Sequence, residues 1–211
     1  NLESTYHTDI QAGLPPPSTE TCPQAMLSLA EQPSIQWLER PMSSGDAAAI
    51  QFSRSNPDIV YLGIEVNQHS LYRSDDGGLS WTRIHMFDHA KDLAVHPRNP
   101  DIVFLNESHY VWRTDTGGEV RSAGQLLEGT AFTSVLESPY GFGPAATSWS
   151  SVEISSSDPN VVYVAMKGGG SNDSTQALYR SDNGGLTFYQ IDGEPPVINV
   201  LFVHPYETNT V

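Results

Sequence analysis

The chain has 211 residues and a formal net charge of -15, from 10 Lys and Arg against 25 Asp and Glu. Ten cationic side chains are too few to neutralise a nucleic-acid backbone, so nucleic acid is excluded as the main partner. No apolar run is long enough to cross a bilayer, and the single cysteine, Cys22, cannot form a disulfide within the chain. The acidic, Ser-, Thr-, Asn- and Gly-rich composition leads us to expect an exported protein, extracellular or periplasmic.

The first part of the chain lacks the periodicity of a folded domain. Residues 1–34 contain a run of three prolines, Pro15 to Pro17, and have little apolar patterning outside Ala25–Ala30. We therefore predict an extended, proline-rich arm over residues 1–34. From Ile35 to Arg40 the pattern becomes strand-like, and we expect this segment to be the outer strand of a last blade.

One sequence phrase then recurs along the chain. It starts with Asn-Pro-Asp or Asp-Pro-Asn, continues into an aliphatic strand, and ends after a second strand at a pair of glycines. The three copies begin at Asn56, Asn99 and Asp158 and reach the glycine pairs that start at Gly77, Gly117 and Gly184. A fourth copy begins at His204, where His204–Val211 match the register of His96–Val103. Repeats of this period predict an array of equal sheets.

Each copy has the pattern of four short strands. In the first copy we predict strands over Ala47–Ser53, Ile59–Val66, Ser70–Ser74 and Ser80–Ile84. Four antiparallel strands per repeat make one propeller blade, so we expect an all-β fold, a β-propeller with about three and a half repeats in this chain. Propellers close with roughly four to eight blades. We therefore expect residues 35–211 to continue beyond the C-terminus or to be completed by another chain.

The glycine-pair segment resembles the Asp-box, also called the bacterial neuraminidase (BNR) repeat, with the pattern Ser/Thr-x-Asp-x-Gly-x-Thr-Trp/Phe. The first copy fills the pattern with Ser74, Asp76, Gly78, Ser80 and Trp81. The third fills it with Ser181, Asn183, Gly185, Thr187 and Phe188, while the second retains only Thr114 and Gly118. With Asn-Pro-Asp-Ile-Val-Tyr, these boxes make residues 46–211 similar to sortilin-type propellers, photosystem II assembly factors and xyloglucan-active endoglucanases. The resemblance implies the fold, whereas such boxes occur in enzymes and binding proteins alike.

The box residues have a structural explanation. A short carboxylate or amide binds backbone N–H groups, the glycines allow positive φ, and the aromatic residue caps the core between sheets. In a four-strand meander the first-to-second and third-to-fourth turns share one end, which we call the box end. The second-to-third loops and the connections between repeats share the other, which we call the loop end. His96 and His204 each precede a proline at the box end, where capping the turn explains them.

The repeats differ in the lengths of their connections. We place these differences in the second-to-third loop of the third repeat and in the connection between the second and third repeats, over Ser122–Ser148. Both positions belong to the loop end, so we predict that all length variation falls there. Insertions confined to one face of a repeat array usually mark its binding face, although unselected loops also drift in length.

The candidate ligand or partner residues come from these loops. They are four histidines, three carboxylates and three aromatics: His69, His85, His89, His109, Asp88, Glu107, Asp173, Tyr140, Phe142 and Trp149. Histidines and carboxylates from neighbouring loops could hold a transition metal, but without a tight spacing signature solvated loop histidines are the better interpretation. The aromatics suit sugar stacking or a protein contact, or else pin the loop to the sheet. We predict no metal, no cofactor and no catalytic residue.

These observations favour an exported, non-enzymatic propeller that presents its loop end to a protein or glycan partner. A polysaccharide-active glycoside hydrolase is the first alternative, since carboxylates are available at the loop end, although availability alone does not establish two facing carboxylates. An accessory or assembly subunit of a larger redox complex is the second, suggested by the resemblance to assembly factors.

Overall fold

The computed structural model describes residues 46–65, 69–87, 90–107, 109–118, 121–122, 125–126, 131–139, 148–167, 176–193 and 198–211. The chain divides into two units, Asn1–Glu39 and Arg40–Val211, and every described residue belongs to the second. The predicted arm at 1–34 and the predicted strand at Ile35–Arg40 lie outside the described residues. Within the described part, no helix is long and apolar enough to span a membrane.

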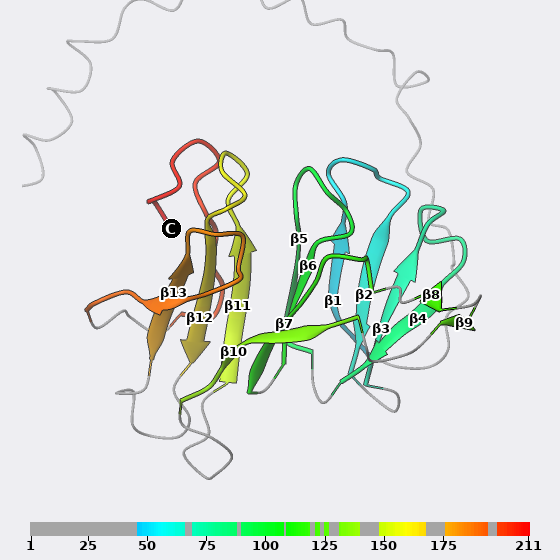
Figure 1. Cartoon of the computed structure of the whole chain (residues 1–211), viewed down its shortest axis with the longest axis horizontal. Coiled ribbons are helices and arrows are strands. Elements are labelled where there is room, and N and C mark those ends of the chain that lie inside the picture. Colours follow the sequence, from blue (N-terminus) through cyan, green and yellow to red (C-terminus); the bar gives the residue numbers. More distant parts are fainter. Residues whose placement is uncertain are drawn as a thin grey trace, which may run out of the picture. The chain divides into compact units, whose positions relative to one another are not determined.

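The described residues form three four-stranded antiparallel sheets in chain order (Figure 1). The first sheet has the order β1-β2-β3-β4, with strands Ala47–Phe52, Val60–Ile64, Ser70–Ser74 and Thr82–Met86. The second has the order β10-β7-β6-β5; in chain order its strands are β5 (Asp92–Val95), β6 (Val103–Asn106), β7 (Tyr110–Thr114) and β10 (Thr133–Glu137). The third has the order β11-β12-β13-β14, with strands Ser148–Ile154, Val162–Lys167, Ala177–Ser181 and Tyr189–Gln190. A small hairpin joins β8 (Arg121–Ser122) to β9 (Gln125–Leu126).

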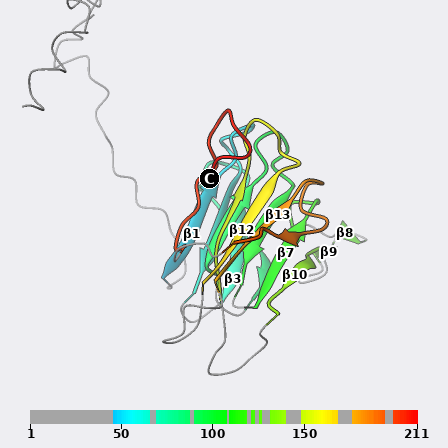
Figure 2. The ribbon, with the colours of Figure 1, turned by 90° about the vertical axis from the view of Figure 1, so that its left-hand side faces the viewer.

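The sheets pack face to face because both faces of the middle strands are apolar. In β6, Val103 and Leu105 belong to the core between the first and second sheets, whereas Phe104 belongs to the core between the second and third. In β12, Val162 and Val164 face the second sheet, and the other face packs against Leu201 of a following segment. Figure 2 shows the strands of successive sheets overlapping almost in parallel when viewed along the stack. This arrangement confirms the predicted four-stranded blades.

The strand boundaries follow the turn chemistry. The third strand of the first blade, Ser70–Ser74, is as predicted, and the second is shorter, ending at Ile64. The fourth strand begins at Thr82 instead of Ser80, because the Ser80 N–H and hydroxyl bind Asp76 and hold Ser80 in the turn. A side chain that bonds locally to the backbone competes with the ladder in this way.

The prediction that all length variation falls at the loop end is wrong. The connection between β7 and β10 runs from Asp115 to Phe132 and includes the β8–β9 hairpin, whereas the equivalent turns of the other blades are Asp75–Trp81 and Asp182–Phe188. This connection joins the third and fourth strands, so its extra residues belong to the box end. β10 is a five-residue strand without a box of its own to mark it, so the sequence of Ser122–Ser148 resembles a single connection between blades. The connection from β10 to β11 is also longer than that from β4 to β5, so the loop end keeps part of the variation.

Candidate binding face and blade junctions

The box turn of the first blade is held by its own side chains. Asp76 Oδ1 accepts hydrogen bonds from Ser74 Oγ at 2.8 Å and from the Ser80 N–H at 2.8 Å, and its Oδ2 accepts from Ser80 Oγ at 2.6 Å. The Gly78 N–H donates to Ser74 Oγ at 2.8 Å, and Trp81 Nε1 donates to the Gly78 carbonyl at 3.1 Å. These bonds, chiefly those from Ser80, lower the pKa of Asp76 to about 2. The turn therefore satisfies itself and leaves no group aimed at a ligand.

The other two boxes repeat this geometry with different polar groups. Asn183 Oδ1 accepts from Ser181 Oγ at 2.8 Å and from the Thr187 N–H at 3.0 Å, while Phe188 packs on the core between the second and third blades. In the second box the Gly118 N–H still donates to Thr114 Oγ1, at 3.2 Å. The structural role predicted for these residues thus agrees with their contacts. His96 and His204 accept backbone N–H groups on Nδ1, as turn caps do.

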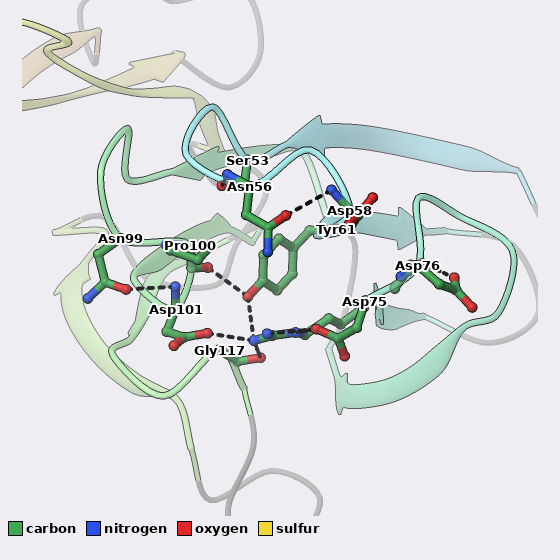
Figure 3. Close-up of polar contacts among 12 residues, drawn as sticks. Ser53, Asn56, Asp58, Tyr61, Asp75, Asp76, Asn99, Pro100, Asp101 and Gly117 are labelled. Atoms are coloured by element: carbon green, nitrogen blue, oxygen red, sulfur yellow. Dashed lines mark hydrogen bonds and ion pairs between the residues drawn. The ribbon is translucent and has the colours of Figure 1, made fainter.

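A second set of phrase residues joins one blade to the next (Figure 3). Arg73 Nη1 donates to Tyr61 Oη at 3.0 Å and to Asp101 Oδ1 of the second blade at 2.8 Å. Tyr61 in turn donates to the Pro100 carbonyl at 2.8 Å, and Asp75 holds the other edge of the guanidinium at 2.9 Å. Burial alone would lower the pKa of Arg73, but Tyr61 and the two carboxylates more than offset it, and its pKa is raised. Arg73 is therefore a permanent cation at this junction.

The same junction recurs after the third blade. Arg180 Nη1 donates to Tyr163 Oη at 2.7 Å and to Asn209 Oδ1 at 2.6 Å, and Tyr163 donates to the Thr208 carbonyl at 2.8 Å. Thr208 and Asn209 occupy the positions of Pro100 and Asp101 in the matching register. We call this arrangement the blade clamp: a tyrosine and an arginine of one blade bound to the Asn-Pro-Asp turn of the next segment, or to its counterpart Glu207–Asn209.

The second blade has a reduced clamp. Phe104 replaces the tyrosine and offers no hydroxyl, and Arg113 lies 5.9 Å from the centre of the Phe104 ring. Arg113 Nε donates to the Gly184 carbonyl at 3.2 Å. Tyr61 and Arg73 of the first copy recur as Tyr163 and Arg180 in the third, and this recurrence is the sequence signal of the repeated contact.

An aromatic and histidine cluster lies between the first two blades. His85 lies with its ring centre 4.6 Å from that of Phe132 and 5.9 Å from that of Trp112. Trp112 Nε1 donates to the Glu107 carboxylate. Burial lowers the pKa of His85, although Glu107 opposes this. His85 and Glu107 thus both contact Trp112, inside the blade junction.

His69 and His109 lie at the loop end and are half-buried. His69 has a φ of 38°, the one positive value among the non-glycine residues of the described ranges. Its carbonyl accepts from the Phe87 N–H at 2.8 Å, and the His109 carbonyl accepts from the Ser138 N–H at 2.8 Å. A non-glycine residue held in this region stores strain, which is most often found at functional positions.

Two predicted face residues are in strands, not in loops. His85 lies in β4 with 6% of its surface exposed, and Trp149 lies in β11 with none exposed, its ring edge-on to Tyr179 at 5.4 Å. Both are core residues, so the prediction that they contact a ligand from the surface is wrong. Glu107 is likewise buried against Trp112. The remaining candidates, Asp88, His89, Tyr140, Phe142 and Asp173, lie outside the described residues.

Buried polar atoms without a partner gather at the loop end. Among the described residues they include both side-chain atoms of Asn106, His85 Nδ1, Trp149 Nε1 and Gln176 Oε1. Asn106 ends β6, Gln176 immediately precedes β13, and His85 and Trp149 lie next to connections between blades. Buried polar groups in a native protein are normally hydrogen-bonded to protein or to water. The buried polar atoms at the loop end therefore need hydrogen-bond partners beyond those that the described residues supply.

Across the ranges that the structure describes, no three His, Cys, Asp or Glu side chains come together as a metal site.

A second polar site lies beside β1, β5 and β11, the first strands of the three blades. It is a hollow of about 210 Å³ that is lined by Gln51, Phe52, Arg54, Ala94, Val95, Pro97, Glu153, Ile154, Ser156 and Phe202. Burial, together with the nearby Asp92, raises the pKa of Glu153 to about 7. Asp92 is held by Ser151 Oγ at 2.8 Å and by the Val152 N–H at 3.0 Å, and burial raises its pKa despite these bonds. Both carboxylates lie within strands, so a binding face predicted from the loops does not include them.

The chain matches no family model and no curated protein. Among solved structures it is similar to the GH74 xyloglucanase of Xanthomonas campestris, with 16% identity over 78% of this chain and a TM-score of 0.58. An ancestral GH74 enzyme matches 71% of the chain with 13% identity and a TM-score of 0.50. The fold is that of a β-propeller. YCF48 of Cyanidioschyzon merolae gives 19% identity over 71% of the chain, with a TM-score of 0.46.

The matching structures are much longer than this propeller segment. The chain spans 26% of the Xanthomonas enzyme, 21% of the ancestral GH74 enzyme and 38% of YCF48. Similarity at this level of identity shows the β-propeller fold alone, and any activity has to be argued from the chemistry of the chain itself.

Proposed function

We propose that the chain is an exported binding scaffold, extracellular or periplasmic, whose loop end contacts a protein or glycan partner. The observation that carries this proposal is the contrast between the two ends of the blades. At the box end, Asp76, Asn183 and the clamp arginines have their polar groups paired within the molecule. At the loop end, Asn106 and Gln176 keep buried polar atoms without partners among the described residues.

The strained backbone supports the same end. His69, with its φ of 38°, lies next to β3 at the loop end. Its conformation costs on the order of 1 kcal/mol in isolation, and such strain persists where the surroundings fix the backbone. The strained backbone of His69 and the buried polar atoms without a partner lie at the same end, which favours the loop end over the box end as the binding site.

Photo-crosslinking can test which end binds. A photoreactive amino acid replaces Met86, which is exposed at the loop end, and in a matched variant it replaces Leu186, which is exposed in a box turn. Both side chains are apolar and more than half exposed, so neither change should disturb folding. We expect a crosslinked partner, identified by mass spectrometry of the secreted protein, from position 86 and none from position 186. A partner crosslinked from position 186 alone, or from neither position, contradicts the proposal.

A glycoside hydrolase is the second candidate, and Glu153 is the observation that favours it. A general acid for glycoside cleavage must be protonated near neutral pH, and a carboxyl with a pKa of about 7 meets that condition. Arg54 and Glu153 line the same hollow, which has a volume of about 210 Å³.

Xyloglucan is the first substrate to try, because the structural neighbour from Xanthomonas campestris is a xyloglucanase. If the chain is a hydrolase, it releases reducing ends from xyloglucan, and Glu153→Gln lowers the rate by about 100-fold or more, as the loss of a general acid does. Glu137→Gln, in the exposed end of β10, serves as the control. No release by the wild-type chain, or equal rates for the wild type and Glu153→Gln, removes this candidate.

A further inference from the structure

The box turn of the third blade contains Asn183 followed by Gly184, the one Asn-Gly pair in the whole sequence. In such a pair the backbone nitrogen of the glycine can attack the side-chain carbonyl of the asparagine, because glycine has no side chain to obstruct the approach. Asn183 is exposed, and a methyl group on Gly184 would meet nothing within 4 Å in the described structure. Water and hydroxide can therefore reach this pair.

The reaction open to the pair is deamidation through a cyclic imide. The Gly184 nitrogen loses its proton to hydroxide and forms a bond to Cγ of Asn183, and the bond from Cγ to Nδ2 breaks, so that ammonia leaves. Water then opens the imide. Breaking the bond from Cγ to nitrogen gives an ordinary aspartate, and breaking the bond from the backbone carbonyl carbon to nitrogen gives an isoaspartate, whose main chain is one carbon longer.

The folded turn holds both reacting groups in other bonds. Asn183 Oδ1 accepts from Ser181 Oγ at 2.8 Å and from the Thr187 N–H at 3.0 Å, and its Nδ2 donates to Thr187 Oγ1 at 2.8 Å. The Gly184 N–H donates to the Asn160 carbonyl at 2.8 Å. The nitrogen can attack only after this last bond breaks and the side-chain amide leaves the turn. Deamidation therefore requires local opening of the box turn.

The first box shows how the turn would hold the aspartate product. Asp76 occupies the position of Asn183, and its Oδ1 likewise accepts from the N–H of the residue four positions later. One group differs: Ser80 Oγ donates to Asp76 Oδ2 at 2.6 Å, whereas Thr187 Oγ1 accepts from the asparagine. A hydroxyl can change from acceptor to donor by rotation of its hydrogen alone. The third box can therefore hold an aspartate at position 183, with charge-assisted bonds that are stronger than those of the amide.

The isoaspartate product does not fit this turn. A methyl group on Gly185 would lie 2.2 Å from Phe104 Cζ of the second blade, so the backbone of the third box is close against that blade. The Gly184 carbonyl accepts from Arg113 Nε at 3.2 Å. An added main-chain carbon at position 183 lengthens the turn, and the two glycines cannot both keep these contacts. The two products therefore differ in their effect on the junction between the second and third blades.

We propose that Asn183 is a modification site of this chain: the closed box turn keeps the amide, deamidation to aspartate completes an Asp-box, and deamidation to isoaspartate disrupts the junction with the second blade. The Asp76–Gly77 pair of the first box provides an internal comparison. A carboxyl forms the same imide when it is protonated, because water is then the leaving group, and the hydrogen bonds to Asp76 lower its pKa to about 2. The first box should therefore stay unmodified where the third is converted.

Mass spectrometry of the peptide that contains Asn183 tests the protection. The full chain is incubated at mildly alkaline pH, folded in buffer and unfolded in urea, and a synthetic peptide of residues 178–190 corrects for the effect of urea on the chemistry. We expect the amide to convert at least about tenfold more slowly in the folded chain, because only the opened fraction reacts. Equal rates in the folded and unfolded chain would overturn the proposal.

Two variants of the same turn show which contacts protect the amide. Thr187→Val removes the hydroxyl that accepts from Asn183 Nδ2 and should raise the rate in the folded chain several-fold. Tyr189→Phe is the matched control, because it removes the bond from Tyr189 Oη to Asp182 Oδ2 at 2.7 Å and leaves the bonds of Asn183 in place. Its rate should equal that of the wild type. An equal rise in both variants, or a rise in neither, contradicts protection by the box turn.

Thermal unfolding of the two products tests the second part of the proposal. The aspartate and isoaspartate forms are separated by chromatography, and Asn183→Asp serves as the reference for the first. We expect the aspartate form and Asn183→Asp to unfold at or above the midpoint of the wild type, and the isoaspartate form several degrees below it. Equal midpoints for the two products, or the reverse order, would overturn this part.

Discussion

Arg73 is the residue on which the first blade junction depends most. Its side chain is 10% exposed and bonds Tyr61, Asp75 and Asp101, so replacing it leaves the phenol and two carboxylates without their cation. Because both carboxylates are about half exposed, water recovers part of the loss. We expect Arg73→Met to lower the free energy of unfolding in urea by about 2 kcal/mol.

Arg113→Met is the matched control for this prediction. Arg113 lies at the equivalent position of the next blade but faces Phe104 instead of a tyrosine, and its nearest carboxylate oxygen, on Asp115, is 3.7 Å away. Arg113→Met should lower the free energy of unfolding by less than half as much as Arg73→Met does. Equal losses for the two variants would show that the tyrosine and the Asn-Pro-Asp turn add nothing to the clamp.

Glu153 makes the stability depend on pH near neutrality. Its pKa in the folded chain is about 7, above the ordinary value of 4.5, so the folded state holds a proton that the unfolded state loses first. Stability therefore falls as the pH rises from about 4.5 through 7. Glu153→Gln should lack this fall and be more stable than the wild type at pH 8, by on the order of 1 kcal/mol after allowance for partial exposure. Urea unfolding at pH 5 and pH 8 measures the difference, and an unchanged pH dependence in the variant would contradict it.

At the scale of the blade, the glycine pairs show how closely successive sheets approach. Gly184→Ala places a side chain at a φ of 71° in open space, so it should cost about 1 kcal/mol through backbone strain alone. Gly185→Ala has the same strain at a φ of 74° and also meets Phe104 at 2.2 Å. We expect it to cost a further 1–3 kcal/mol, roughly the range for overpacking. Phe104→Ala should reduce the difference between the two variants, which chemical denaturation can check.

The elements show what the sequence could predict. The glycine pairs and Asn-Pro-Asp turns are local signals, and they predicted the four strands of the first blade, including Ser70–Ser74 to the residue. The β10 strand had no such signal, because its box is degenerate and its connection from β7 contains a hairpin. The clamp and the burial of His85 and Trp149 depend on contacts between blades, and local periodicity does not contain that information.

At the scale of the whole molecule, the central claim is that the first and the third blade are each joined to the segment that follows by a clamp between defined residues. Asp101 receives the arginine of the first blade, and Asn209 that of the third. A repeat array of this kind couples neighbours and leaves non-neighbours independent.

Double-mutant cycles on the unfolding free energy test this claim most directly. We expect an interaction free energy of about 1 kcal/mol or more between Arg73→Met and Asp101→Ala, because the two side chains are in contact. We expect the same between Arg180→Met and Asn209→Ala. We expect no coupling between Arg73→Met and Asn209→Ala, which belong to different junctions. Coupling in this last pair as large as in the first two, or none in any of the three, would contradict the account.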